Sequence, residues 1–455
     1  MFFASLLEVI SVGAVLPFLG VLTAPELVYQ HPFMQPLIEI LELSEPNELV
    51  LPLTMLFISA AVLAGSIRIL LLYAMTRITY ATGADLSIKI YNITLYQEYA
   101  VHVSRNSSEV INGIISKTSQ VVGGVIMPGI NLINSTILIL SIMGALLVID
   151  TIVALSAFIG IGLLYLVIIR YTGKQLKENS KIIADTSTQM IKSLQEGLGG
   201  IRDVLIDGSQ EFYSQLYRSA DLPMRQASGN NQFIGGAPRY ALEAVGMTLI
   251  AALAYIMSLT EGGMATAIPV LGALALGAQR LLPALQQAYA SFSSLRGVEA
   301  SLVDVLELLD QALPEYVNQP SPTPIPFERE IKLTNLSFGY IKESPLILEN
   351  VNLSIAKGEQ IGFMGVTGSG KSTLIDIIMG LLLPTNGELT IDQKKLTREN
   401  RRSWQIHIAH VPQNIYLSDS TIEENIAFGV PLKDIDQLRV QEAAKQAQIS
   451  DMIDD

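Results

Sequence analysis

Long, nearly uncharged runs of residues restrict the fold of this chain more than any other feature of its sequence. Each is close to the length of about 20 residues that an α-helix needs to cross a hydrocarbon core. A soluble protein can bury one such run as a core helix, but six of them within the first 285 residues favour a membrane protein. The composition agrees, because 50% of the 455 residues are hydrophobic and only 16% are charged. The sequence therefore predicts an all-α domain over residues 1–313 with six transmembrane helices, at about 2–22, 51–76, 121–148, 151–171, 238–260 and 263–285.

Lys and Arg are distributed unevenly between these runs, and their positions predict the orientation of the chain. The connection at 23–50 contains no Lys or Arg and five Glu. The segments after the second and the fourth run are basic, with Arg77, Lys89, Arg105 and Lys117 in the one and Lys174, Lys177, Lys181, Lys192, Arg202, Arg218 and Arg225 in the other. We therefore expect a multi-pass protein of the plasma membrane, the inner membrane of a bacterium, with both basic segments and everything after residue 285 in the cytoplasm.

A phosphate-binding loop follows the membrane region. Residues 365–373, GVTGSGKST, fit the pattern GxxxxGK[ST], in which backbone N–H groups of a glycine-rich turn point at phosphate oxygens. In this pattern Lys371 reaches the terminal phosphates and the Ser372 hydroxyl binds Mg²⁺. The apolar run 361–364 predicts a buried strand before the loop, and 373–379 predicts a helix after it, which favours a nucleotide site over an ordinary glycine turn. The predicted nucleotide-binding residues are Gly365, Gly368, Ser369, Gly370, Lys371, Ser372 and Thr373.

The composition changes between the membrane region and the phosphate loop. A helical pattern of apolar residues runs from Ser291 to Leu313, and five prolines between 314 and 326 predict a stiff linker over 314–330. From residue 331 onward short apolar strands alternate with turns, at 331–336, 347–355 and 388–391, which predicts part of an α/β domain over 331–455. His407 and His410 fall in a further apparent strand, where they would point to opposite faces, so we expect no metal site at these histidines.

Two further residues extend the phosphate loop into a family resemblance. Tyr340 ends LSFGY before the loop, and Gln413 lies in HVPQNIYLSDSTIEENIAFG after it. In this order, residues 331–430 resemble the first half of the nucleotide-binding domain of ATP-binding cassette (ABC) transporters, and the six runs before them resemble the exporter subclass. The resemblance implies ATP and Mg²⁺ as cofactors, stacking of Tyr340 on adenine, and a catalytic Gln413 that reaches the Mg²⁺ and the attacking water. It also implies a homodimer whose nucleotide domains close on ATP, with loops near 98–107 and 207–217 carrying this motion to the spans.

The chain departs from the family pattern after Gln413. In the family a serine- and glycine-rich signature, an apolar strand ending in Asp-Glu and a histidine follow, and none of the three occurs before Asp455. The Asp-Glu carboxylate polarises the water and the signature closes the partner's site. We therefore expect an ATP-hydrolysing translocase as the complete protein, but no efficient hydrolysis by these residues alone. Because the first run also begins almost at residue 1, we expect a fragment cut at both ends.

Three arginines in or beside the predicted spans indicate the substrate. Arg68 and Arg280 lie within the second and the sixth span, and Arg239 lies at the start of the fifth. An arginine at membrane depth costs a few kcal/mol unless it faces water or an anion, and its planar guanidinium suits phosphate. Segments such as GLGGIRDVLIDGSQ are also similar to lipid-linked oligosaccharide and polysaccharide flippases. We therefore expect ATP-driven export or flipping of a lipid-linked oligosaccharide or a related phosphate-bearing lipid.

Two other functions stay open at this point. A peptide or drug exporter would have a cavity without these arginines, and a non-hydrolysing, nucleotide-responsive membrane scaffold would need no hydrolytic residues. The net charge of −13 argues against a nucleic-acid partner. The absence of cysteine excludes disulfides and thiolate metal sites.

Overall fold

The computed structural model describes residues 1, 4, 18, 20–22, 25–149, 151–258, 263–317, 319–341, 345–413 and 415–454. The chain divides into two compact units, Met1–Val317 and Asn318–Asp455. The boundary between them falls within the predicted linker at 314–330. Most of the first predicted span, 2–22, lies outside the described residues.

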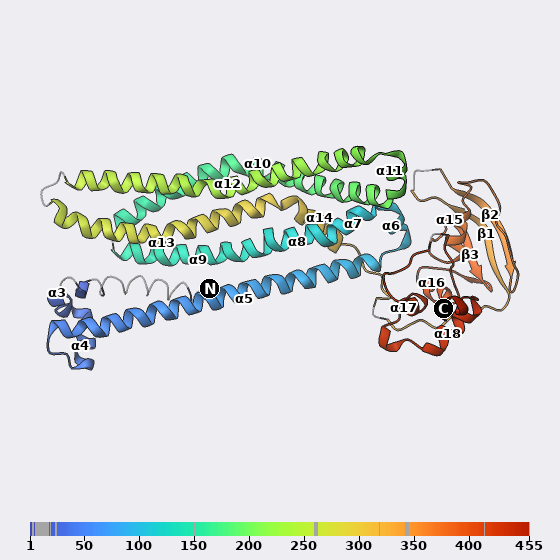
Figure 1. Ribbon diagram of the computed structural model, residues 1–455, viewed down its shortest axis with the longest axis horizontal. Helices are drawn as coiled ribbons and strands as arrows, with labels where there is room; N and C mark the ends of the chain where they lie inside the picture. The colour runs from blue at the N-terminus through green and yellow to red at the C-terminus, as the bar shows by residue number, and fades with distance from the viewer. Residues whose placement is uncertain are drawn as a thin grey trace. The chain divides into compact units, whose positions relative to one another are not determined.

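Long α-helices dominate the first unit (Figure 1). Helices α7 to α9 continue one another along 107–149 and are interrupted by two π-helical turns, η3 and η4. The described elements are α3 (Pro25–Tyr29), η1 (Pro32–Met34), α4 (Gln35–Leu41), η2 (Pro46–Leu49), α5 (Val50–Leu95), α6 (Tyr99–Ser104), α7 (Ser107–Asn112), η3 (Gly113–Lys117), α8 (Thr118–Val121), η4 (Val122–Ile126), α9 (Met127–Ile149), α10 (Thr151–Gly199), α11 (Ile201–Asp207), α12 (Gln210–Ser258), α13 (Gly263–Gly297) and α14 (Glu299–Leu309).

The predicted spans coincide with these helices wherever the structure describes them. The ranges 51–76 and 151–171 lie within α5 and α10, and 121–148 runs from the end of α8 into α9. The range 238–260 follows α12 to its end at Ser258, and 263–285 lies within α13. Among the described residues, two helices, Pro46–Leu95 and Ser107–Gly144, are long and apolar enough to cross a membrane by length and composition. The helical character of the first unit is therefore confirmed, and the six crossings stay a prediction.

Helices α9, α10, α12 and α13 lie side by side, and polar side chains join several of them (Figure 1). Asn112, which is fully buried on α7, donates to the Thr188 hydroxyl of α10 at 3.0 Å and accepts from Ser187 at 3.0 Å. The side-chain amide of Asn179 on α10 donates to the side-chain oxygen Oδ1 of Asn231 on α12 at 2.8 Å. These residues lie in the segments between the predicted spans, where the hydrogen bonds satisfy buried polar side chains and join the helices.

The helical pattern from Ser291 to Leu313 is divided in the structure. Helix α13 ends at Gly297, and α14 begins at Glu299 and ends at Leu309. A Cβ atom at position 297 would lie 2.8 Å from the Asn231 amide nitrogen, so only glycine permits this approach of α12 and α13. The turn also sets α14 against the π-turns, where Lys117 forms an ion pair with Asp304.

The second unit is an α/β unit built on a four-stranded sheet in the order β2-β1-β3-β4. All neighbouring strands are antiparallel, and Ile331 of β1 pairs with Ile355 of β2 on one side and with Ile391 of β3 on the other. The elements are β1 (Glu330–Phe338), β2 (Leu348–Ala356), α15 (Lys371–Ile378), β3 (Asn386–Ile391), β4 (Lys394–Lys395), α16 (Arg401–Gln405), α17 (Ile422–Ile426), η5 (Leu432–Asp434), α18 (Gln437–Gln446) and α19 (Ser450–Asp454).

The core of this unit forms where helix α15 packs with the sheet. Ile377 of α15 is fully buried together with Leu336 and Ile391 of the sheet. Trp404 closes the same core, and its indole N–H donates to the Ile378 carbonyl at 2.7 Å. The α/β class and the three strands predicted at 331–336, 347–355 and 388–391 are confirmed.

Two predicted strands of this unit are wrong. The run 361–364 is irregular, and Met364 is 97% exposed. The segment that contains His407 and His410 is a turn followed by irregular chain, and the His407 ring nitrogen Nε2 lies 2.7 Å from the Ile325 carbonyl oxygen. A strand needs a hydrogen-bonded neighbour, and none of the described strands pairs with either segment.

Candidate functional site

The glycine-rich turn before α15 adopts a conformation that its glycines make possible. Gly368 and Gly370 have φ angles of +83° and +84°, in the left-handed region that side chains with a Cβ disfavour. A Cβ at position 370 would also lie 2.9 Å from Leu348 Cδ2. Gly370 is the N-cap residue of α15, so the loop leads directly into the positive end of a helix, where an anion is stabilised.

Lys371, the first residue of α15, folds its side chain back over this loop. Its ammonium group donates to the carbonyl oxygens of Gly365 and Val366, both at 2.8 Å, and lies 3.4 Å from the Ser369 hydroxyl. All three partners are uncharged. Among the described residues, the ammonium group of Lys371 forms no ion pair. A phosphate placed at the loop would offer Lys371 a charge-assisted hydrogen bond in place of neutral ones.

Tyr340 and the first turn of α15 lie next to each other. The Tyr340 hydroxyl oxygen is 3.3 Å from the hydroxyl oxygen of Thr373, which is 6% exposed. The ring packs edge-on against Phe338, with 5.0 Å between centroids, and the residue remains 42% exposed. Ser372 is exposed beside Thr373, so its hydroxyl is accessible to a hydrated Mg²⁺ ion. The structure therefore brings together the loop, Lys371, Ser372 and an aromatic ring with surface left for a planar base.

Gln413 is not joined to this group. It lies exposed at a bend, and no hydrogen bond between described residues links it to Lys371 or Ser372. Its role as a ligand of Mg²⁺ and of the attacking water stays a prediction. Asp376, on the next turn of α15, carries a titratable group near the site that the sequence reasoning did not identify. Burial raises the pKa of the Asp376 carboxyl, and the charge of nearby His410 acts in the opposite direction.

The three arginines predicted to meet the substrate lie on three different helices. Arg68 is exposed on α5. Arg239 of α12 forms an ion pair with Glu243 one turn along the same helix, with 2.9 Å between Nε and Oε1, and its side chain is 60% exposed. Arg280 lies on α13, and its side chain is outside the described residues. A shared binding site for these arginines stays a proposal.

Comparisons with known proteins assign both units. The family described as ABC transporter transmembrane region matches residues 9–264, and the family described as ABC transporter matches residues 348–455. The structure is similar to a bacterial Atm1-family ABC exporter with ATP bound, with a TM-score of 0.73 and 19% identity over 97% of this chain and 77% of that one.

Two of the curated relatives are named for lipid flipping and for fatty acid transport. The chain is 25% identical over 289 residues to the ATP-dependent lipid A-core flippase of Chromohalobacter salexigens, which is 63% of this chain and 49% of the relative. It is 28% identical over 271 residues to the fatty acid ABC transporter ATP-binding/permease protein of Mycobacterium tuberculosis, which is 58% of this chain and 41% of the relative. The chain thus spans about half the length of the curated relatives that it matches.

Proposed function

This chain belongs to the ABC transporter family, and from that premise we propose that it is one subunit of a homodimeric, ATP-driven exporter or flippase for a phosphate-bearing lipid such as a lipid-linked oligosaccharide. The contact between Tyr340 and the first turn of α15 carries the nucleotide part of the proposal. It places an exposed aromatic ring beside a loop that fits a triphosphate. Long apolar helices with cytoplasmic basic connections support the membrane part, in the inner membrane of a bacterium.

In this proposal the residues of the loop bind ATP without large rearrangement. The backbone N–H groups around Gly368 and Gly370 and the N-terminus of α15 hold the phosphates. Lys371 leaves the carbonyls of Gly365 and Val366 and donates to the terminal phosphates instead. Ser372 binds Mg²⁺, Tyr340 stacks on the base, and Gln413 orients the attacking water. Closure of two nucleotide domains on ATP would reach the membrane helices through the loops near 98–107 and 207–217.

The substrate is inferred from charge and from the relatives. Arg68 and Arg280 fall within the predicted spans 51–76 and 263–285, where a guanidinium is favourable if it meets an anion or water. A phosphate or diphosphate is the anion that the planar guanidinium binds best, through two parallel hydrogen bonds. Arg239 forms an ion pair with Glu243, so a phosphate bound at Arg239 would share the guanidinium with this carboxylate.

A fatty acid is the second candidate, because one group of relatives is named for fatty acid transport and a carboxylate also suits an arginine. ATPase activity of the full-length protein in lipid nanodiscs separates the two. We expect a polyprenyl diphosphate-linked oligosaccharide to stimulate turnover and a long-chain fatty acid to leave it at the basal rate. Stimulation by the fatty acid, or by an amphipathic peptide, without a response to the diphosphate lipid would reject the proposed substrate.

A further inference from the structure

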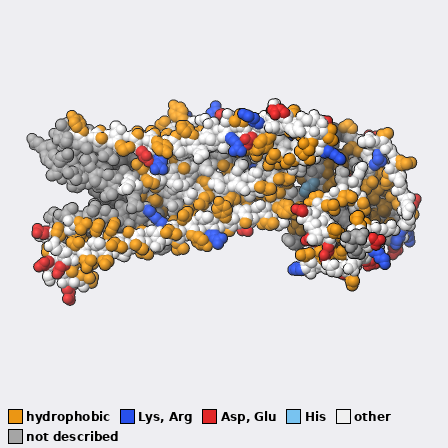
Figure 2. All heavy atoms as spheres, in the orientation of Figure 1, with side chains coloured by type: hydrophobic (Ala, Val, Ile, Leu, Met, Phe, Trp, Pro, Cys, Tyr) orange, Lys and Arg blue, Asp and Glu red, His pale blue; other side chains and the backbone are white. Residues whose placement is uncertain are grey.

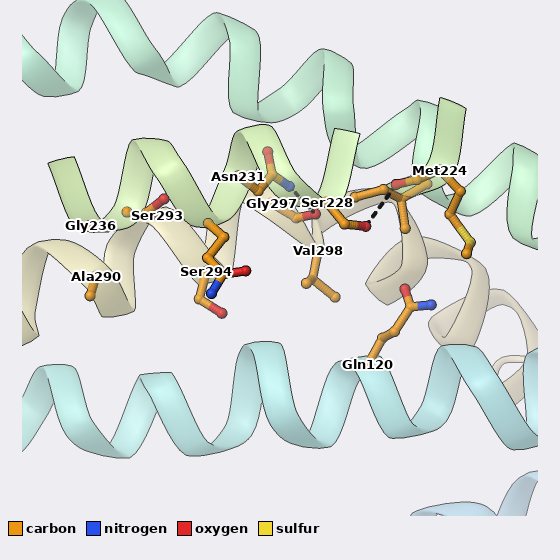
Figure 3. Close-up of a pocket in the computed structure, with 13 residues that line it drawn as sticks. Gln120, Met224, Ser228, Asn231, Gly236, Ala290, Ser293, Ser294, Gly297 and Val298 are labelled. Carbon is orange, nitrogen blue, oxygen red and sulfur yellow. Dashed lines mark hydrogen bonds between the residues drawn. The ribbon is translucent and has the colours of Figure 1, made fainter. Parts of the chain in front are cut away.

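A partly open cavity of about 610 Å³ is lined by α8, α10, α12 and α13 of the helical unit (Figure 3). Its volume is in the range of about 300–1,000 Å³ that is typical of small-molecule sites. Gln120 of α8 reaches into it from one side, and Ser293 and Ser294 of α13 line it from another (Figure 3). Nothing in the mechanism described above uses this cavity.

The polar groups that line the cavity are all uncharged. They are three carboxamides and three hydroxyls, from Gln120, Ser228, Asn231, Gln232, Ser293 and Ser294. The described lining contains no Lys, Arg, His, Asp or Glu. A charged ligand would lose its hydration here without gaining a counter-ion from the described lining residues. The lining therefore favours a neutral ligand that combines apolar surface with hydrogen-bonding groups.

Hydrogen bonds within the lining and to neighbouring residues hold the lining in place. Asn231 accepts a hydrogen bond from Asn179 of α10 and lies 3.5 Å from the Gly297 carbonyl, to which its amide donates. The Ser294 hydroxyl donates to the Gly124 carbonyl at 3.2 Å. A Cβ added to Gly236 would meet no atom within 4 Å, so the wall there has room for a ligand. Hydrogen-bonded side chains such as Asn231 thus form part of the wall, and the wall at Gly236 leaves space for a ligand.

The position of the cavity along the helices indicates what kind of headgroup can reach it. On α12 it precedes the predicted span 238–260, and on α13 it follows the predicted span 263–285, so it lies at the cytoplasmic end of both. Ser293 lies about 12 Å beyond the end of the sixth span at a rise of about 1.5 Å per residue. The headgroup layer beyond the hydrocarbon core is only about 5–8 Å thick. The wall at Gly236 borders the start of the fifth predicted span, whereas Ser293 lies beyond the headgroup layer, so a sugar attached to an interfacial phosphate can extend along the cavity.

We propose that this cavity binds a neutral sugar unit of the transported lipid, which rests on the proposed function of the protein as a lipid flippase or exporter. The sugar hydroxyls would exchange hydrogen bonds with the carboxamides of Gln120, Asn231 and Gln232. The arginines proposed for the phosphate belong to the predicted spans of α5, α12 and α13, at positions 68, 239 and 280. Sugar and phosphate would then be recognised by different parts of the helical unit.

The test measures binding directly and does not depend on ATP turnover. The probes are radiolabelled decyl maltoside, which has a neutral disaccharide headgroup, and decyl tetra(ethylene glycol), which has the same chain and no sugar. Each is titrated below its micelle concentration against the full-length protein in lipid nanodiscs. We expect saturable binding of the maltoside over the sugar-free probe.

The decisive variant is Gly236→Leu, whose Cβ meets no atom within 4 Å and whose side chain would occupy part of the cavity. We expect it to weaken maltoside binding at least tenfold. Gly229→Leu is the matched control, because Gly229 is also exposed on α12, has no atom within 4 Å of its added Cβ, and does not line the cavity. Gln232→Met, which keeps the size of the side chain and removes its amide, serves as a second variant and should weaken maltoside binding severalfold.

Each result decides the proposal. Equal binding of the two probes to the wild-type protein, or unchanged maltoside binding in both Gly236→Leu and Gln232→Met, would overturn it. Loss of binding in Gly229→Leu as well would assign the effect to the helix and not to the cavity, and would also overturn it. Since the readout is binding, a negative result leaves the phosphate-lipid proposal standing, and a lack of ATPase stimulation by the diphosphate lipid leaves the cavity measurement unaffected.

Discussion

Tyr340 and Thr373, far apart in the sequence, place their hydroxyl oxygens 3.3 Å from each other at the start of helix α15. This contact fixes the position of the ring relative to the phosphate loop. Because the residue remains 42% exposed, we expect its ring to accept a planar base on its open face.

We expect Tyr340→Ala to weaken ATP binding about fivefold to a hundredfold, since stacking of a base on an aromatic ring contributes about 1–3 kcal/mol. Tyr340→Phe keeps the ring and should bind ATP nearly as well as the wild-type protein. The measurement is the Kd of a fluorescent ATP analogue, with inorganic triphosphate as a ligand that lacks the base. If Phe is as harmful as Ala, the hydroxyl contact with Thr373 matters and the stacking role is wrong.

Lys371→Ala should abolish ATP-dependent transport and reduce triphosphate binding, because the phosphates lose their fixed cation. The backbone of the loop should persist, since its shape depends on Gly368 and Gly370 and not on the lysine. Lys433→Ala, at an exposed position in η5, is the matched control and should transport normally. Transport by the Lys371→Ala variant at the wild-type rate would contradict the assignment of the loop.

The Asp392 carboxylate predicts a pH dependence of stability in the nucleotide domain. It accepts hydrogen bonds from the backbone N–H groups of Glu328, Arg329 and Glu330, and these, led by that of Glu328, lower the pKa of the Asp392 carboxyl below its ordinary 3.8. A lowered pKa in the folded state stabilises the fold above the unfolded value, and this contribution is lost as pH falls through the folded value.

Asp392→Asn should therefore lower the thermal midpoint of the full-length protein at pH 7, and the difference from wild type should shrink once the pH drops below 3.8. Asparagine also tolerates the φ of +45° at this position, so backbone strain is not the cause. Asp419→Asn, at an exposed site, is the control. A difference that stays constant from pH 7 to pH 3 would show that the charge of Asp392 is unimportant.

The absence of cysteine allows a clean test of orientation. Ser44 is exposed in the connection predicted to face outside, and Gln210 is exposed at the start of α12 in a segment predicted to be cytoplasmic. In intact cells a membrane-impermeant maleimide should label Ser44→Cys at once and Gln210→Cys only after permeabilisation. The reverse pattern would invert the predicted topology.

The sequence predicts the nucleotide loop well because its shape depends on a few residues at fixed spacing. Gly368 and Gly370 adopt positive φ angles that any other residue would resist, and Lys371 begins the helix that follows. The segment 361–364 is predicted wrongly for the opposite reason. Four apolar residues in a row indicate burial, but a strand forms only beside another strand, and that neighbour is a property of the fold that a local pattern does not contain.

No sequence pattern predicts the cavity beside Asn231 as strongly as the glycine-rich pattern predicts the nucleotide loop. Its lining comes from four helices, and uncharged amides and hydroxyls form no motif of fixed spacing. The one related feature of the sequence is a polar face on α12 before an apolar span. It is formed at helical spacing by Ser228, Asn231, Gln232 and Gly235. Such a face indicates a polar surface, and only the packing of α8, α10 and α13 around it makes a cavity.

Substitutions of Arg68 distinguish an arginine that binds phosphate from one that only reaches the membrane surface. If Arg68 binds the lipid diphosphate, Arg68→Lys should restore only part of the lipid-stimulated ATPase activity, because a point charge cannot form the two parallel hydrogen bonds of a guanidinium. Arg68→Gln should lose the stimulation and keep the basal rate, since the nucleotide loop lies in the other unit of the chain. If Arg68 only extends to the interface, Lys should serve as well as Arg. Arg280 should respond as Arg68 does if it binds the same diphosphate. The measurement is the ATPase rate against added polyprenyl diphosphate-linked oligosaccharide, and equal stimulation of the Arg, Lys and Gln forms at normal expression would remove the reason for choosing a phosphate-bearing substrate.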